Sequence, residues 1–444
     1  MKFMKFGKTL LMIAISVGIT LGITSCVQSY SVGYLYVTGT NNAASSNNGI
    51  ISGFKIDHNK GKLTPIHGLP VASGGANPGR AVLLSGGRFI YVLNRGKNSL
   101  GTADCTAADP CLGANITEFS IGGNGILSPQ GQAFYPQGIN PIRIFTDSSG
   151  NFLYTLDQVA PDSSTCALAL GSSVTSCGDI TAFKIDSNTG RLTLIVNAQV
   201  TSASGQALPY FPVPANPIDF ALTSSYILTL SGTPTDGDSV FPYTYSAATG
   251  QLTINQNSSQ PLNIKQATAI VSAGGFAYVL DNEPGTYNAN GSTVTAPGWI
   301  FPFSVGTNGA LQQQSGGAVP DDVTLSNPVY LVLESKGKWI YVLNQGNNTN
   351  PNVSQSGIAG YVIDPATHYP TEISGSPFGT GSGPQCILED PSNQFIYTAN
   401  FNDSTVTGRV VDQNSGVLND LRDSAKSYPL EGPAAWCIVT GRTS

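Results

Sequence analysis

A short apolar run that ends in a small or polar residue recurs seven times along the chain. Runs of this kind, rich in β-branched and aromatic residues, are typical of strands buried on both faces. Repetition of one unit indicates that each copy is a structural module that packs against its neighbours. The seven copies are Tyr34–Gly39, Phe89–Asn94, Phe152–Asp157, Tyr226–Ser231, Phe276–Asp281, Trp339–Asn344 and Phe395–Asn400.

Each run is flanked by further segments that also predict strands. The following segment is apolar and in most copies leads to a turn with Gly and then Leu, as at Gly190 and Leu192, although the copy at His368 lacks the glycine. The preceding segment usually opens with Asn-Pro, as at Asn140-Pro141, and Lys265 holds the proline position of the fifth copy. Seven units of four antiparallel strands, without helical stretches, predict an all-β fold, the seven-bladed β-propeller.

The two ends of the chain complement each other. The first unit lacks its proline-led strand, and the C-terminus supplies a spare one at Gly432–Val439. We expect this strand to join the N-terminal blade and close the ring, which removes open sheet edges. Charged residues make up only 10% of the chain, against about 25% in average soluble proteins. This composition suits short strands and neutral turns, and residues 33–444 are predicted to form a single propeller domain.

The N-terminus predicts an exported lipoprotein. Lysines precede an apolar stretch from Leu10 to Ile23, a pattern typical of a signal peptide. The sequence Ile23-Thr24-Ser25-Cys26 resembles the bacterial lipobox, in which the cysteine is lipidated. We therefore expect residues 1–25 to be removed, Cys26 to carry lipid and residues 26–32 to form a tether in the cell envelope, at the outer membrane or facing the periplasm. An ordinary secretory signal with an unrelated cysteine is the alternative.

Six further cysteines support export, because an even number in an exported chain suggests disulfides. Cys105 and Cys111 share one loop, as do Cys166 and Cys177, which favours two local pairs. Cys386 and Cys437 fall on the same side of adjacent inner strands. A third disulfide that seals the closing blade is preferred there, with two buried free thiols as the alternative. A zinc site is disfavoured because no Cys-x-x-Cys spacing occurs, and neither a metal nor a cofactor is expected.

The candidate site lies where the proline-led strands enter the centre of the ring. In a four-stranded meander, the connections between strands 2 and 3 and between units emerge on one face, and the long insertions fall there. Loops on a rigid scaffold often carry binding sites. The residue two after each proline position should point the same way in every blade. These residues are Arg80, Arg143, Asp219, Ala267, Tyr330, Cys386 and Ala435.

Two arginines beside an aspartate make Arg80, Arg143 and Asp219 the strongest candidates for chemistry, and Arg95 could join them. A guanidinium group donates hydrogen bonds in a planar fork that suits a carboxylate or phosphate. The structural alternative is that these arginines pair with Asp219 or with backbone carbonyls and only rigidify the channel.

Three motifs together resemble the lactonase-type seven-bladed propellers, which include the propeller form of 6-phosphogluconolactonase and the YVTN-repeat surface proteins. They are the tyrosine-containing runs, the Asn-Pro-led strands and the turn from Asp186 to Leu192. The resemblance spans residues 33–440 and implies the propeller fold. Enzymes of the family typically carry Pro-Arg-His on the inner strand and Asn-Glu after strand 2. This chain departs from both patterns, with Pro78-Gly79-Arg80 and with Asp281-Asn282-Glu283.

The favoured function is therefore non-catalytic. A lipid-anchored propeller would bind a small molecule or a protein at the channel mouth through Arg80, Arg95, Arg143 and Tyr330. The alternative is a hydrolase that opens a lactone or a related ester. In that case the arginines would hold a carboxylate or phosphate, and Asp219 or Glu283 would position water.

The predicted partners are limited. The net charge of −6 disfavours nucleic acid, which requires a clustered basic face. We expect contact with the membrane only through the lipid anchor, and a monomer.

Overall fold

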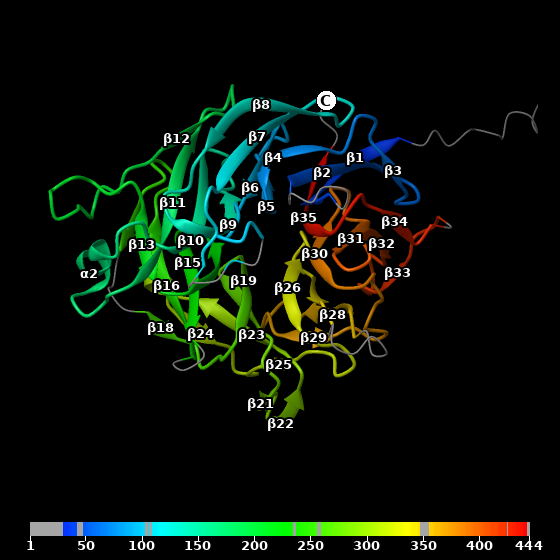
Figure 1. The fold of residues 1–444 in the computed structure, drawn as a ribbon. Coiled ribbons are helices and arrows are strands. Elements are labelled where there is room, and N and C mark those ends of the chain that lie inside the picture. The colour runs from blue at the N-terminus through cyan, green and yellow to red at the C-terminus, as the bar shows by residue number, and fades with distance from the viewer. Residues whose placement is uncertain are drawn as a thin grey trace, which may run out of the picture.

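A computed structural model describes residues 30–41, 48–102, 105, 109–233, 237–254, 259–346, 355–423 and 425–441. Seven antiparallel sheets surround a common centre, and the labelled inner strands encircle it (Figure 1). The fold is the predicted seven-bladed propeller. The predicted signal peptide, residues 1–25, and the lipidation site Cys26 lie outside the described residues. None of the helices in the described part is long and apolar enough to cross a bilayer.

Each blade contains four strands ordered from the centre outward. The innermost strands of blades 1 to 7 are β35 (Ala434–Gly441), β5 (Pro78–Leu83), β9 (Ile139–Thr146), β14 (Pro217–Leu222), β19 (Ala267–Ala273), β26 (Pro328–Leu333) and β30 (Pro384–Glu389). The second strands contain the repeated runs and are β1 (Ser31–Thr40), β6 (Phe89–Asn94), β10 (Phe152–Val159), β15 (Tyr226–Thr233), β20 (Phe276–Asp281), β27 (Trp339–Asn344) and β31 (Phe395–Asn400).

The outer half of each blade is formed by a long third strand and a short fourth strand. The third strands are β2 (Asn48–Asp57), β7 (Asn115–Ile121), β11 (Cys177–Ile185), β16 (Gly237–Tyr245), β23 (Trp299–Val305), β28 (Gly357–Ile363) and β32 (Thr405–Val411). The fourth strands are β3 (Leu63–Pro65), β8 (Leu127–Phe134), β12 (Leu192–Leu194), β17 (Leu252–Ile254), β24 (Leu311–Gln313), β29 (Pro370–Glu372) and β33 (Leu418–Asp420).

Five blades add a fifth short strand that also pairs with the third strand. These strands are β4 (Val71–Ala76), β13 (Phe211–Pro214), β18 (Gln260–Pro261), β25 (Val319–Pro320) and β34 (Ser427–Pro429). Blade 2 differs, because its fourth strand β8 has eight residues and covers both positions. A one-turn 3₁₀ helix, η1 (Thr307–Gly309), precedes β24.

The ring closes as predicted. Strand β35 pairs antiparallel with β1, so the end of the chain completes the first blade, with Val37 opposite Cys437. In Figure 1 the red β35 lies beside the blue β1 and β2. Strand β35 covers the edge of β1 that would otherwise be exposed, which protects this strand from pairing with other chains.

The tyrosine repeated in strand 2 contacts the turn repeated between strands 3 and 4 of the neighbouring blade. In six blades the hydroxyl of the aromatic residue in the middle of strand 2 donates a hydrogen bond to a turn carbonyl of the next blade. The donors and acceptors are Tyr36 to Gly125, Tyr91 to Gly190, Tyr154 to Gly250, Tyr278 to His368, Tyr341 to Gly416 and Tyr397 to Gly61. Blade 4 has Leu228 at this position. The tyrosines therefore join neighbouring blades.

The turn position requires a left-handed backbone. Gly416 has φ of +74°, and a Cβ atom there would lie 2.6 Å from the ring of Trp339. Glycine satisfies both requirements because it has no side chain. His368 takes the position in blade 6 with φ of +57°, and its ring stacks on Phe276 at 3.7 Å.

We expect Tyr341→Phe to lower the free energy of unfolding by about 1–2 kcal/mol, because it leaves the buried Gly416 carbonyl without its donor. Chemical denaturation of the purified protein measures the loss. Tyr135→Phe is the matched control, since Tyr135 is 60% exposed, and it should leave stability unchanged. Equal stabilities of the two variants would contradict a role for the tyrosines in joining the blades.

The strand register corrects two of the seven predicted inner positions. A bulge near the start of the inner strands places Arg143 opposite Leu156 and Tyr330 opposite Leu343. The matching residues in blades 5 and 1 are Ala269 and Trp436, and not Ala267 and Ala435. In blade 5 the turn between the first two strands is two residues shorter than in most blades. In blade 1 the inner strand comes from the other end of the chain, so no hairpin fixes its register.

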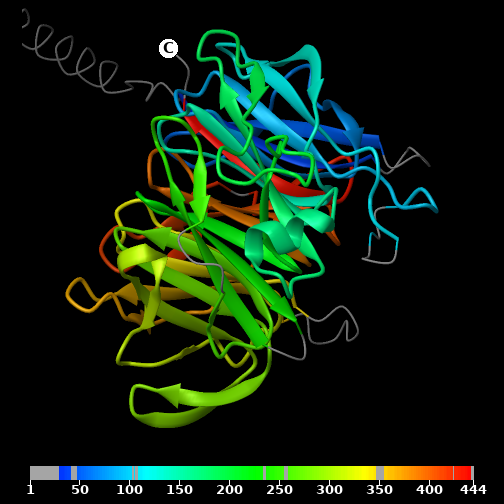
Figure 2. The ribbon, with the colours of Figure 1, turned by 90° about the vertical axis from the view of Figure 1, so that its left-hand side faces the viewer.

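All three predicted disulfides form. Cys105–Cys111 lies within the long connection of blade 2, Cys166–Cys177 ties the connection of blade 3 to the start of β11, and Cys386–Cys437 links β30 to β35. The connection of blade 3 also contains the helix α2 (Ser164–Leu170), and that of blade 5 forms a hairpin of β21 (Gly285–Ala289) and β22 (Ser292–Ala296). Figure 2 shows this hairpin extending away from the body of the propeller.

Candidate functional site

The central channel contains two cavities that meet at one layer of side chains. The cavity on the side of the loops, here called the mouth cavity, has a volume of about 550 Å³ and is lined by the starts of the inner strands. The deeper cavity, of about 420 Å³, is lined by the later residues of the same strands. Arg80, Arg143 and Trp436 line both cavities. The structure therefore brings the predicted arginines to the boundary between the two.

The Asn-Pro pairs at the mouth position the inner strands. Asn77, Asn140, Asn216 and Asn327 all have positive φ, between 50° and 56°. Asparagine tolerates this conformation better than most residues. The backbone carbonyl of Asn77 accepts a hydrogen bond from the Arg95 amide at 3.0 Å, and Asn327 does the same for Gln345 at 2.9 Å. These two pairs thus fix the entry of an inner strand against the end of strand 2.

Arg143 and Asp219 form an ion pair across blades 3 and 4. The Nε atom of Arg143 lies 2.8 Å from Oδ1 of Asp219, whose side chain is only 5% exposed. The other carboxylate oxygen accepts a hydrogen bond of 3.2 Å from the backbone N–H of Ile270. Both oxygens of this buried carboxylate are therefore engaged by donors.

Arg80 is held by aromatic rings. Its guanidinium carbon lies 3.8 Å from the ring centroid of Trp436 and 4.6 Å from that of Tyr330, within the range of cation–π contacts. The two rings contact each other edge to face at 4.9 Å. Burial and the nearby positive charge of Arg143 lower the pKa of Arg80 to about 10. Arg80 thus remains charged at neutral pH, and among the described residues no carboxylate forms an ion pair with it.

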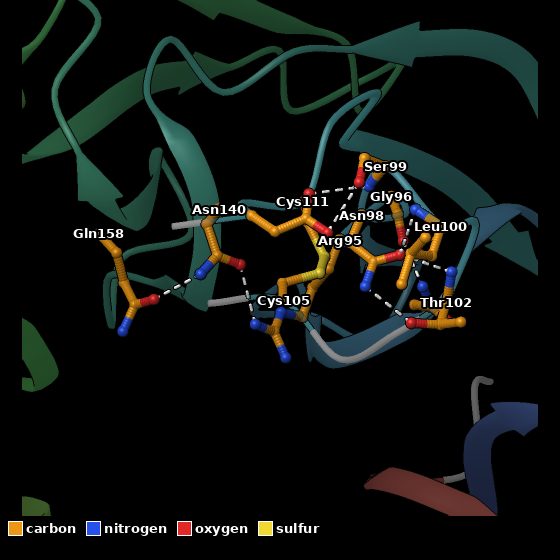
Figure 3. Close-up of a disulfide and its surroundings, with 12 residues drawn as sticks. Arg95, Gly96, Asn98, Ser99, Leu100, Thr102, Cys105, Cys111, Asn140 and Gln158 are labelled. Atoms are coloured by element: carbon orange, nitrogen blue, oxygen red, sulfur yellow. Dashed lines mark hydrogen bonds between the residues drawn. A yellow bond between two sulfur atoms is a disulfide. The ribbon is translucent and has the colours of Figure 1, made fainter. Parts of the chain in front are cut away.

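Arg95 reaches the mouth cavity from the end of β6. Its Nη2 donates a hydrogen bond of 2.8 Å to Oδ1 of Asn140, which also contacts Gln158 (Figure 3). Burial, followed by the charge of Arg143, lowers the pKa of Arg95. Figure 3 also shows the Cys105–Cys111 disulfide beside Arg95. The disulfide therefore constrains the connection that follows this arginine.

Other predicted residues lie apart from this group. Glu283 is half-buried and lines neither channel cavity. Its backbone N–H donates a hydrogen bond of 3.0 Å to Asp281. His58 stacks on Tyr30 and His67 is exposed. Among the described residues that line the channel cavities, Asp219 is thus the one carboxylate and no histidine is present.

Trp436 is the site residue that sequence reasoning missed. Its position depends on the register of β35 against β1. The spacing from Pro433 predicts Ala435, the preceding residue, for this position. Among the described residues, no group of three or more histidine, cysteine or acidic side chains is arranged to hold a metal ion.

Residues 303–434 match the family model described as lactonase, seven-bladed β-propeller. This match confirms the predicted resemblance to the lactonase-type propellers. No curated protein matches the chain in sequence.

Solved lactonase-type propellers share the fold. A candidate 6-phosphogluconolactonase from Bacteroides fragilis is 17% identical, with a TM-score of 0.61 over 92% of this chain and 98% of that one. One from Bacteroides uniformis is 15% identical, with a TM-score of 0.63 over 92% of this chain and 100% of that one. The periplasmic gluconolactonase of Pseudomonas aeruginosa is 16% identical, with a TM-score of 0.60 over 92% of this chain and 99% of that one. At these identities the structural comparisons concern the fold alone.

Proposed function

We propose that this lactonase-type propeller binds a small anionic ligand, a carboxylate or a phosphate ester, in its mouth cavity. One observation carries the proposal: among the described residues that line this cavity, the ionisable side chains are those of three arginines, Arg80, Arg95 and Arg143. Positive charge of this density is costly to bury without counter-charge, and arginine suits planar oxyanions. Asp219 neutralises only one of the three, so two positive charges remain. A carboxylate would balance one of them, and a phosphate dianion both.

The proposed place of action is the bacterial cell envelope. Three disulfides favour an oxidising compartment. The predicted signal peptide would direct export, and lipid on Cys26 would then hold the protein there through its acyl chains. A partner protein at the same mouth is compatible with this arrangement if it offers an acidic side chain.

Lactone hydrolysis is the second candidate function. A gluconolactonase from the periplasm of Pseudomonas aeruginosa has the same fold, so an exported location agrees with such an activity. Asp219 would then have to orient water, although Arg143 and the Ile270 amide already occupy both of its oxygens. We favour binding for this reason.

Calorimetric titration of the purified protein with D-gluconate and with 6-phosphogluconate tests the binding proposal. Arg80→Gln and Arg95→Gln should each weaken binding of the preferred anion about tenfold, because each removes a charge-assisted hydrogen bond worth roughly 1.5 kcal/mol. Arg422→Gln, at an exposed position, is the control and should bind normally. Absence of binding by both anions, or unchanged affinity in both mouth variants, would refute the proposal. Turnover of glucono-δ-lactone by the wild-type protein would instead favour the hydrolase.

A further inference from the structure

Blade 2 departs from the repeat at one buried position. In every blade, the residue in the middle of strand 2 faces a partner on strand 3. In six blades this partner is small or carries no polar side chain: Gly53, Ala182, Pro242, Pro302, Gly360 and Gly408. In blade 2 the partner of Tyr91 is Glu118. A carboxyl group thus occupies a position that the fold elsewhere keeps free of charge.

The outer strand of blade 2 also differs from the outer strands of other blades, next to the same position. In blades 1, 3 and 6 an isoleucine covers the small partner and donates its backbone N–H to it, as Ile66 does to Gly53 at 2.9 Å. In blade 2 the continuous strand β8 takes the place of this isoleucine segment. Its pairing with β7 has an irregularity between Thr117 and Phe119. Glu118 lies at this irregularity. The isoleucine cover of blades 1, 3 and 6 is absent there, and Gln130 and Gln132 of β8 line the same cavity as Glu118.

These two departures produce a cavity of about 440 Å³ between blades 2 and 3, here called the outer cavity. Its lining includes Glu118, Gln130 and Gln132 from blade 2, Arg88 before β6, and Arg191 from the turn of blade 3. The volume falls within the range of small-molecule sites. None of these residues lines the channel cavities, so the outer cavity is separate from the mouth.

Glu118 is buried without a partner. Its side chain is 2% exposed, and within the described part of the chain neither carboxyl oxygen has a hydrogen-bond partner. Buried polar groups in native proteins are nearly always paired, and an orphan of this kind needs a physical explanation. Arg88 and Arg191 are both exposed beside it. A ligand that donates to Glu118 and accepts from the arginines would satisfy all three groups.

The geometry points to a binding site for a small zwitterion, an α-amino acid or a close analogue, in the outer cavity. Its ammonium group would donate to Glu118 and its carboxylate would accept from Arg88 and Arg191. The ammonium gives the buried carboxyl the opposite charge that it lacks, and the arginines at the opening supply the fork that a carboxylate requires. Gln132 lies in the same lining and could contact the ligand side chain, whereas the Gln130 amide nitrogen already donates to Ser120 and Ser128.

The protonation of Glu118 gives the proposal an independent readout. Burial raises the pKa of Glu118 to about 7, and the charge of Arg191 opposes this shift. The other titratable groups around Glu118 are Tyr91, its partner on β6, and Arg88, whose side chain lines the same cavity. The free carboxyl is therefore partly protonated at neutral pH. An ammonium ion would favour its ionised form, so binding should release protons.

A thermal-shift screen of the purified protein against the proteinogenic L-amino acids, with D-glucose as a neutral comparison, identifies the binder. Calorimetry with that amino acid should show at least tenfold weaker binding by Glu118→Gln and by Arg191→Gln. Its N-acetyl and amide derivatives, which each lack one charge, should bind at least tenfold more weakly to the wild-type protein. Titration at pH 7 in two buffers of different ionisation enthalpy should reveal proton release that Glu118→Gln abolishes.

Two control variants separate this site from loss of folding and from the channel. Glu431→Gln changes an exposed acid, and Arg95→Gln changes the mouth cavity, so both should bind the amino acid normally. Glu118→Gln is expected to fold, since it removes an unpaired buried charge. Absence of any amino-acid binding, binding of glucose instead, or full affinity in Glu118→Gln would each overturn the proposal.

Discussion

Replacing both Cys386 and Cys437 by alanine is expected to lower the free energy of unfolding by about 4 kcal/mol. The disulfide joins residues 51 apart in sequence, and a cross-link that closes a loop of this length restricts the unfolded chain by about that amount. It also ties β30 of the last blade to β35, the strand that completes the first blade. Its loss should therefore weaken the closure of the ring in the folded protein, in addition to releasing the constraint on the unfolded chain.

The local disulfide at the mouth provides the matched control. Cys105 and Cys111 are separated by only six residues, so the double alanine variant should lose only about 2 kcal/mol. Guanidinium titration followed by circular dichroism measures both losses. If the two double variants unfold at the same denaturant concentration, the Cys386–Cys437 bond does not carry the closing function that its position suggests.

Much of the propeller could be predicted because its physical causes are local and repeated. The runs such as Phe89–Asn94 show strand periodicity within six residues. Their sevenfold recurrence fixes the number of blades. The missing strand of the first unit and the spare strand at the C-terminus predict closure, because an unpaired edge is unfavourable.

Contacts between blades could not be predicted in the same way. The hydroxyl of Tyr91 and the carbonyl of Gly190 are 99 residues apart. Both features were visible as repeats, but nothing local links them. The place of Trp436 beside Arg80 likewise depends on strand register, which the pairing of β35 with a distant segment decides. Glu118 is conspicuous only when the register shows that other blades have small or uncharged residues at its position.

The candidate site was predicted to the extent that it follows from strand alternation. Arg80, Arg143, Asp219 and Tyr330 lie together because they share one position on the inner strands of blades 2, 3, 4 and 6. Glu283 was placed by analogy with a family motif that this chain does not preserve, and the structure leaves it outside the channel cavities. Five of the seven inner positions could therefore be assigned from the repeat, whereas a residue in an insertion could not.

Asp219→Asn should separate the two candidate functions, because it acts on stability and on binding in opposite directions. The substitution leaves Arg143 without its buried counter-charge, next to Arg80, and we expect a loss of about 3 kcal/mol in the free energy of unfolding. The same change removes the negative charge that competes with an anionic ligand for Arg143. Binding of gluconate or 6-phosphogluconate should therefore strengthen, by roughly tenfold or about 1.4 kcal/mol.

The control for this variant is an ion pair of the same type at the surface. Asp420, whose side chain is 49% exposed, pairs with Arg409 and Lys426, and Asp420→Asn should cost less than about 1 kcal/mol without affecting anion binding. If Asp219 instead positions water for lactone opening, Asp219→Asn should abolish turnover of glucono-δ-lactone. Weaker anion binding in Asp219→Asn would contradict the binding proposal, because it would make the carboxylate a contributor to the site and not a competitor for its arginine.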